Sequence, residues 1–143
     1  MTGAPARLSV ELADRGYDIL VGEGLIGDAA RHMTPVLKRP RVVIVTDRAV
    51  AELHLPPLEA SLGAAGIRHD HVVLPPGEAT KEFGQLARLL DALLDLRIDR
   101  HTTLIALGGG VIGDIGGFAA SIVLRGIDYI QIPTTLLAQV DSS

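Results

Sequence analysis

The chain has 143 residues, of which 48% are hydrophobic but only 3% aromatic, so a core of Leu, Ile, Val and Ala is expected. Its 13 basic and 17 acidic residues give a formal net charge of −4, and no basic cluster is interleaved with aromatic residues, which disfavours nucleic-acid binding. The absence of cysteine excludes a disulfide framework, a thiolate nucleophile and a cysteine zinc site.

The N-terminal segment MTGAPARLSVELADRG lacks the apolar stretch of a signal sequence. Longer apolar runs elsewhere are interrupted by glycine and charged residues, so no membrane segment is expected. A soluble, cytoplasmic protein is therefore expected. Because no repeat or linker divides the sequence, residues 1–143 are expected to form one domain.

The first part of the sequence predicts a hairpin and a helix. Leu8, Val10 and Leu12 alternate with polar residues, and residues 17–21 do the same after a turn of Asp, Arg and Gly. Two alternating segments joined by a short turn predict an antiparallel β-hairpin. Residues 24–33 then have apolar residues at helical spacing.

The middle of the sequence predicts alternating strands and helices. Residues 41–46 form an apolar strand, and residues 49–65 a helix that Pro56 and Pro57 interrupt and Gly66 ends. Residues 72–74 predict a third strand, which the sequence PPG closes.

The next helix is predicted over residues 80–96. Its apolar residues recur on one face, Thr80 is in the place of an N-cap, and Phe83 and the leucines are expected in the core.

A glycine-rich turn follows the next strand. Residues 104–107 are apolar, as in a central buried strand, and Gly108, Gly109 and Gly110 come directly after them. Without Cβ atoms the backbone can turn tightly and let a pyrophosphate approach. Residues 112–124 predict a helix whose first N–H groups and dipole favour an anion, with Gly113 allowing close packing on the strand.

The spacing of Gly108, Gly110 and Gly113 matches the G-x-G-x-x-G fingerprint of dinucleotide-binding turns. That fingerprint also requires an acidic residue about 20 positions further on, and Pro133 stands there. A glycine turn that binds no ligand is therefore an alternative. Asp114 favours a ligand, because it places a carboxylate where ribose hydroxyls could be held.

With a last strand over residues 129–132, the order of elements predicts an α/β fold, a Rossmann-like, doubly wound and mostly parallel sheet after the hairpin. Ligands bind beyond the carboxyl ends of such strands. Taken alone, Asp47 is as typical of a helix cap as of a ligand-binding residue. Lys81 alone is more typical of a solvated side chain than of a functional one. Together, however, four consecutive strand ends carry small or ionisable residues: Asp47; Gly77, Glu78 and Lys81; Gly108 to Asp114; and Thr134 with Thr135.

These segments resemble a known family. GGGVIGDIGGFAAS, followed by LRGIDYIQIPTTLLAQVDSS, is similar to the signature of 3-dehydroquinate synthases and the wider sugar phosphate cyclases. PPGEATK resembles their second cofactor segment, and YDILVGEGL and VIVTD are also in the style of the family. The resemblance covers nearly the whole chain and rests on several motifs in the same order.

The resemblance implies an NAD-binding domain. It assigns Asp47 to the adenosine ribose, upstream of the glycine turn and on another strand, which accounts for the missing downstream acid. The implied cofactor residues are Asp47, Gly77, Glu78, Lys81, Gly108, Gly109, Gly110, Val111, Ile112, Gly113, Asp114, Thr134 and Thr135.

Arg125 and Asp141 match positions that contact the substrate in that family, and the planar fork of an arginine suits a phosphate or carboxylate. The implied reaction is the NAD-dependent cyclisation of 3-deoxy-arabino-heptulosonate 7-phosphate to 3-dehydroquinate, with elimination of phosphate, in the shikimate pathway. A divalent metal, zinc or cobalt, acts as a Lewis acid there.

The family's metal ligands, one Glu and two His, belong to a helical C-terminal domain that this chain does not contain. The chain alone is therefore expected to be inactive, and the whole enzyme a homodimer. His69 and His71 could face the same side of a strand, but such a pair is more typical of solvent-facing residues, so no metal site is expected here. The alternatives are a related cyclase of secondary metabolism and a stand-alone nucleotide-binding domain without catalysis.

Overall fold

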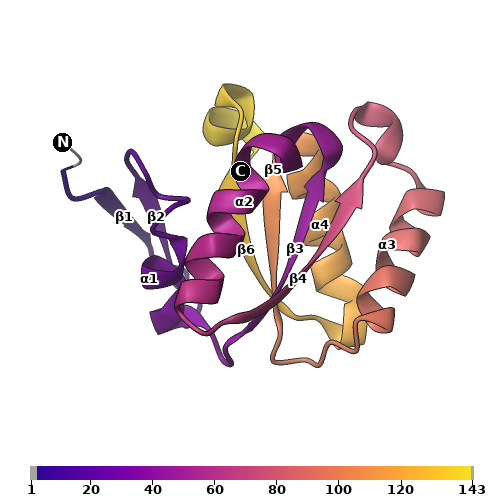
Figure 1. Cartoon of the computed structure of the whole chain (residues 1–143), viewed down its shortest axis with the longest axis horizontal. Coiled ribbons are helices and arrows are strands. Elements are labelled where there is room, and N and C mark those ends of the chain that lie inside the picture. The colour runs from indigo at the N-terminus through magenta and orange to yellow at the C-terminus, as the bar shows by residue number, and fades with distance from the viewer. Residues whose placement is uncertain (1–2, 143) are drawn as a thin grey trace.

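A four-stranded parallel sheet with helices on both faces forms the body of the chain (Figure 1). The structure is a computed structural model that describes residues 3–142, with side chains as far as residue 140. The sheet has the order β4-β3-β5-β6. Its strands are β3 (Arg41–Asp47), β4 (Arg68–Leu74), β5 (Thr103–Gly108) and β6 (Asp128–Pro133). The predicted doubly wound parallel sheet is confirmed.

The helices are divided between the two faces of this sheet. One face carries α1 (Ala29–Met33) and α2 (Arg48–Ala64), and the other carries α3 (Phe83–Asp95) and α4 (Gly110–Ile122) (Figure 1). Short helical segments are η1 (Thr34–Val36), η2 (Glu78–Thr80), η3 (Val123–Arg125) and the π-helical η4 (Ala138–Ser142). None of the helices in the described part of the chain is both long and apolar enough to span a membrane.

Two apolar clusters hold the layers together, one on each face of the sheet. Alternation along β3 sends Val43 and Val45 to the side of α3 and α4, and Val42 and Ile44 to the side of α1 and α2. Every residue of β5 is buried, as expected for a central parallel strand covered on both faces.

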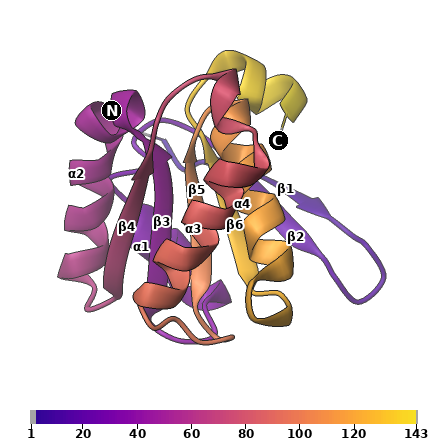
Figure 2. The ribbon, with the colours of Figure 1, turned by 90° about the vertical axis from the view of Figure 1, so that its right-hand side faces the viewer.

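The predicted hairpin is confirmed. Strands β1 (Ala6–Val10) and β2 (Tyr17–Val21) pair antiparallel as a separate sheet. Figure 2 shows this hairpin extending away from the parallel sheet. Its surface is largely exposed, including the apolar side chains of Leu8, Tyr17 and Ile19.

Two predictions about the helices in the first half of the chain are wrong, one about a boundary and one about an interruption. Within the predicted helix 24–33, only α1 is helical, and the residues before it form turns. The prolines do not interrupt α2 either, since Pro56 and Pro57 lie inside it on an exposed face. Carbonyl groups left without N–H donors can there bond to water. Gly66, with φ of 73°, follows the end of α2 as predicted.

The helix predicted from Thr80 begins instead at Phe83. Thr80 lies in η2, is buried, and donates its hydroxyl to the carbonyl of Pro75, so it does not cap α3. Phe83 is 88% exposed and is not a core residue, because the first residue of α3 projects beyond the edge of the apolar cluster. The core contacts of α3 come from Leu89 and Leu93, which are fully buried.

We expect Leu89→Ala to destabilise the domain by about 2–5 kcal/mol, because it leaves a cavity between α3 and the sheet. Leu94→Ala removes the same atoms from a side chain of α3 that is 50% exposed, and should cost less than about 1 kcal/mol. Denaturant unfolding of both variants measures the difference. Equal losses would contradict the packing described for α3.

Candidate functional site

The sheet changes winding direction between β3 and β5. From β3 the chain crosses to β4 on one side, and it returns to β5 on the other side of β3. Thr46 and Leu107 are paired in the register of these two strands, so Asp47 and Gly108, the next residue of each, lie beside one another. The crevice beyond the carboxyl ends of the strands at such a switch point is where open α/β sheets bind ligands.

Asp47 caps helix α2 at this point. Its backbone is extended, with φ of −106° and ψ of 170°, and its Oδ1 accepts a hydrogen bond of 2.9 Å from the N–H of Val50. Within the described residues, the carboxylate of Asp47 accepts no other hydrogen bond. The second oxygen of a half-buried carboxylate is therefore available to a ligand at the switch point.

The glycine turn is fixed by its neighbours. A Cβ atom on Gly108 would lie 2.8 Å from the Cβ of Ile112, and one on Gly109 would lie 3.2 Å from Cγ2 of Thr135. The N–H of Thr134 donates to the carbonyl of Gly108 over 3.0 Å. No side chain fits at Gly108 without displacing α4. The backbone between β5 and the helix is therefore not covered by side chains of its own.

Helix α4 begins at Gly110, where its first N–H groups have no acceptor within the helix. Val111 is half-buried, whereas the side chain of Ile112 belongs to the core. Both residues can therefore act on a ligand mainly through the backbone. The helix dipole adds positive potential at this end, which suits a phosphate.

An ion pair joins the turn after β4 to helix α4. Lys81 Nζ lies 2.7 Å from Oδ2 of Asp114 and 3.6 Å from Oε2 of Glu78. The hydrogen bond to Asp114 raises the pKa of Lys81 above its ordinary value, with the charges of Asp114 and Glu78 acting in the same direction. All three side chains are exposed to solvent, so the pair adds little stability, and its charged groups are accessible to a ligand.

Gly77 sets the path of this second segment. Its φ of 103° lies in a region that side-chain-bearing residues rarely adopt, and it turns the chain from the end of β4 into η2. The turn brings Glu78 and Lys81 toward α4. The sequence segment PPGEATK thereby reaches the glycine turn in space.

The tight packing of α4 on the sheet involves other glycines than the one predicted. A Cβ on Gly113 would make an ordinary contact of 3.5 Å to Gln131, so the expectation of close packing there is wrong. On Gly116 a Cβ would lie 3.2 Å from Cβ of Ala106, and on Gly117 it would lie 3.1 Å from the ring of Tyr129. Helical spacing, which puts these residues one turn further along α4, could have indicated them.

Tyr129 is a site residue that the sequence analysis missed. Its hydroxyl donates a hydrogen bond of 2.8 Å to the carbonyl of Gly113 and accepts one from Gln131. Burial raises the pKa of Tyr129, the hydrogen bond from Gln131 opposes this, and the nearby charge of Asp114 adds to it. The phenol therefore stays protonated and fixes the first turns of α4 against β6.

Thr134 and Thr135 lie next to the glycine turn, at the end of β6. Thr134 is half-buried, and Thr135 Oγ1 accepts a hydrogen bond of 3.1 Å from the N–H of Ala138. The hydroxyl of Thr135 thus begins the segment leading into η4. The structure brings together, at the carboxyl edge of the sheet, all four predicted strand-end segments.

Arg125, one of the two predicted substrate residues, does not lie with this group. Arg125 lies in η3, beyond the far end of α4, and a helix of 13 residues is about 20 Å long. It is therefore at the amino edge of the sheet, opposite the glycine turn. Asp141 lies in η4, and its side chain is outside the described part of the structure.

His69 and His71 occur on the same side of β4, as their spacing predicts. Both imidazoles face Glu59, with distances of 3.5 Å and 3.1 Å to its Oε2. Among the described residues, no group of three or more His, Cys, Asp or Glu side chains is arranged to hold a metal ion.

A bare glycine turn, a helix N-terminus and a strand-end carboxylate at one switch point define a doubly wound α/β domain of the nucleotide-binding class. Residues 71–143 match the family model described as 3-dehydroquinate synthase N-terminal. This match includes just over half of the chain. The chain therefore belongs to the 3-dehydroquinate synthase family.

Curated relatives agree with this assignment. The chain is 67% identical over 136 residues to a 3-dehydroquinate synthase of Rhodospirillum rubrum, covering 95% of this chain and 35% of the relative. It is 55% identical over 134 residues to that of Jannaschia sp., covering 94% of the chain and 36% of the relative. The chain thus spans about a third of the length of these relatives.

Solved structures of sugar phosphate cyclases have the same fold. A 2-deoxy-scyllo-inosose synthase complexed with carbaglucose-6-phosphate, NAD+ and Co2+ is 25% identical, with a TM-score of 0.85 over 96% of this chain and 38% of that one. A 2-epi-5-epi-valiolone synthase from Streptomyces hygroscopicus with NAD+ and Zn2+ bound is 31% identical, with a TM-score of 0.78 over 93% of this chain and 36% of that one.

We expect Gly108→Ala to destabilise the domain by about 1–3 kcal/mol, because its Cβ would overlap Ile112. Gly63→Ala is the matched control in helix α2, where a Cβ would meet only an atom 3.8 Å away and should stabilise by up to about 1 kcal/mol. Thermal unfolding compares the two. A Gly108 variant as stable as the Gly63 variant would refute the described turn.

Proposed function

We propose that the chain is the NAD-binding part of a 3-dehydroquinate synthase. The whole enzyme would convert 3-deoxy-arabino-heptulosonate 7-phosphate to 3-dehydroquinate and phosphate in the shikimate pathway. The observation that carries the proposal is the position of Asp47 beside the glycine turn at the switch point. The chain that contains it is 67% identical to one such enzyme over 95% of this chain.

The residues at the carboxyl edge fit a dinucleotide. The carboxylate of Asp47 would accept hydrogen bonds from the adenosine ribose while still capping α2. The bare backbone at Gly108 to Gly110 and the first N–H groups of α4 would donate to the pyrophosphate. Thr134 and Thr135 close the other side of the turn.

The proposed cofactor set is completed by residues of the turn after β4 and of the start of α4. These are Gly77, Glu78, Lys81, Val111, Ile112, Gly113 and Asp114. Lys81 and Asp114 would lie beside the nicotinamide ribose, where their ion pair holds the carboxylate in orientation. Bound NAD would supply reversible hydride transfer at a substrate hydroxyl. In this chain the role of the residues is to bind and orient the cofactor.

A divalent metal, zinc or cobalt, would polarise the same hydroxyl, with ligands from residues outside this chain. Residues 1–143 would then be the cofactor-binding domain of a longer, homodimeric, cytoplasmic enzyme, and inactive without the rest. Two sugar phosphate cyclases of the same fold have both NAD+ and a divalent metal in their structures, which supports the use of both groups.

A related cyclase of secondary metabolism is the second candidate, favoured by the TM-score of 0.85 to the 2-deoxy-scyllo-inosose synthase. The purified full-length protein, supplied with NAD+ and a divalent metal, separates the two. Phosphate release from 3-deoxy-arabino-heptulosonate 7-phosphate, with formation of 3-dehydroquinate, supports the proposal. Turnover of glucose 6-phosphate instead would favour the second candidate.

Asp47→Asn should weaken NAD+ binding by the full-length protein about tenfold, because asparagine still caps α2 but removes the charge from the ribose hydrogen bonds. Calorimetric titration with NAD+ measures the loss. Asp28→Asn, which removes a carboxylate next to α1 and outside the site, is the control and should bind as the wild type does. Unchanged affinity of the Asp47 variant would refute the role of its charge.

Arg125→Ala should raise the KM for the sugar phosphate about tenfold, because Arg125 matches a substrate-contacting position of the family. NAD+ affinity should stay unchanged, because the exposed guanidinium lies far from the glycine turn. Steady-state kinetics and NAD+ titration of the full-length protein give the two values. Equal losses in both would mean that Arg125 has no specific role toward the substrate.

A further inference from the structure

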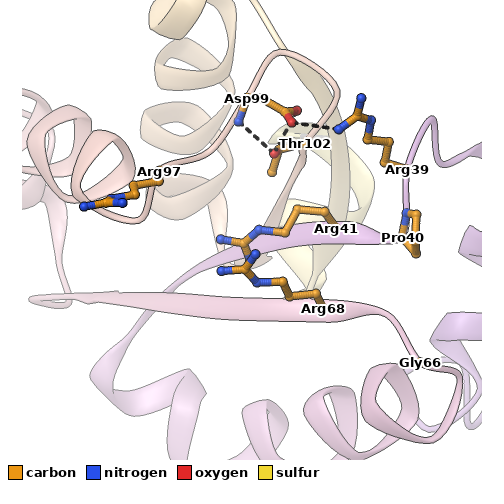
Figure 3. Close-up of a pocket in the computed structure, with 8 residues that line it drawn as sticks. All are labelled: Arg39, Pro40, Arg41, Gly66, Arg68, Arg97, Asp99 and Thr102. Atoms are coloured by element: carbon orange, nitrogen blue, oxygen red, sulfur yellow. Dashed lines mark hydrogen bonds and ion pairs between the residues drawn. The ribbon is translucent and has the colours of Figure 1, made fainter.

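The edge of the sheet opposite the glycine turn holds a polar pocket. It lies where β3 and β4 begin and where the chain enters β5, and has a volume of about 380 Å³ (Figure 3). Its lining is rich in arginine and consists of Arg39, Pro40, Arg41, Gly66, Arg68, Arg97, Asp99 and Thr102. Because the strands separate it from the carboxyl edge, this amino-edge pocket is distinct from the proposed cofactor site.

Two of these arginines are direct neighbours in the sheet. Arg41 and Arg68 are paired in the parallel register of β3 and β4, and Figure 3 shows their guanidinium groups side by side. Like charges at paired positions destabilise a sheet unless something compensates for them. Asp70, two residues further along β4, compensates for the charge of Arg41 by an ion pair of 2.8 Å.

Arg41 is held firmly in place. Its side chain is only 11% exposed, and its guanidinium also donates to the carbonyls of Val42 and Leu96, over 3.0 and 3.4 Å. Arg68 differs, since within the described residues its guanidinium has neither an ion pair nor a hydrogen bond. The positive charge of Arg68 is therefore uncompensated at the pocket.

Arg97 is an arginine in a place typical of glycine. It follows the end of α3 with φ of 54°, and its N–H donates to the carbonyl of Leu94 over 2.9 Å. The left-handed conformation is unfavourable for a residue with a Cβ, and strain of this kind often accompanies a functional side chain. In the described part of the chain, the guanidinium of Arg97 likewise has no ion pair.

Asp99 is already engaged on the far side of the pocket. It pairs with Arg39 over 3.2 Å and accepts a hydrogen bond from the N–H of His101. That hydrogen bond, aided by the charge of Arg39, lowers the pKa of Asp99, so its carboxylate is ionised and neutralises Arg39. Arg68 and Arg97 thus leave an excess of positive charge here, on a chain whose net charge is −4.

We propose that the amino-edge pocket binds a small phosphorylated anion. Guanidinium groups recognise phosphate oxygens through paired hydrogen bonds. Arg41 is a fixed neighbour of the freer Arg68, and Arg97 also lines the pocket. The volume of about 380 Å³ is at the small end of the range for ligand pockets, which suits a diphosphate or a sugar phosphate.

The proposal is tested on the full-length protein saturated with NAD+, with pyrophosphate as the probe in calorimetric titrations. Arg97→Gly should bind pyrophosphate about tenfold more weakly, because it removes a guanidinium while relieving the unfavourable backbone, so that loss of folding is not the cause. Arg68→Gln should weaken binding to a similar degree. Arg88→Gln, on the exposed part of α3, loses the same charge outside the pocket and should bind normally.

Hydrogen exchange locates the bound pyrophosphate. Protection should fall on residues 38–41, 66–70 and 96–102. Parallel titrations with inorganic phosphate and glucose 6-phosphate identify the source of the phosphate group, and tighter binding of either one supports the proposal with that ligand. Unchanged affinity in both arginine variants, or protection confined to residues 108–114, would overturn it.

Discussion

The parallel pairing of β3 with β5 is the contact on which the remaining architecture depends. These strands are the middle of the sheet and are buried on both faces, so their residues supply both apolar clusters. The chain also reverses its winding direction between them. One pairing therefore fixes the core and places Asp47 beside the glycine turn, where a dinucleotide would cross the sheet.

Packing on one face keeps that turn in shape. Gly116 and Gly117 let α4 approach β5 and β6 closely, and the hydroxyl of Tyr129 holds the carbonyl of Gly113. The N-terminus of α4 is thereby directed along the carboxyl edge. The amino edge has a different chemistry, since arginines gather there around a pocket, and we propose that it binds an anion separately from the carboxyl edge.

Much of the fold was predictable because its patterns are local. Strand positions, the hairpin and the glycine turn follow from hydrophobic period and from residues such as Gly66 that permit particular backbone angles. Helix starts were less predictable. Thr80 is a residue type that is common at N-caps, but its hydroxyl donates to the carbonyl of Pro75 instead. This hydrogen bond depends on how the loop folds back. The exposure of Phe83 follows from that arrangement of the loop.

By itself, the sequence determined the doubly wound fold, the strand-end residues of the candidate site and the family. Each of these depends on short-range patterns of apolar residues, glycines and motifs. Only the tertiary structure decided which residues meet: Lys81 with Asp114, Tyr129 with Gly113, Arg41 with Arg68, and Arg125 far from the glycine turn. Such contacts join residues far apart in the chain, and their partners are fixed by strand order and helix packing, which no local pattern contains.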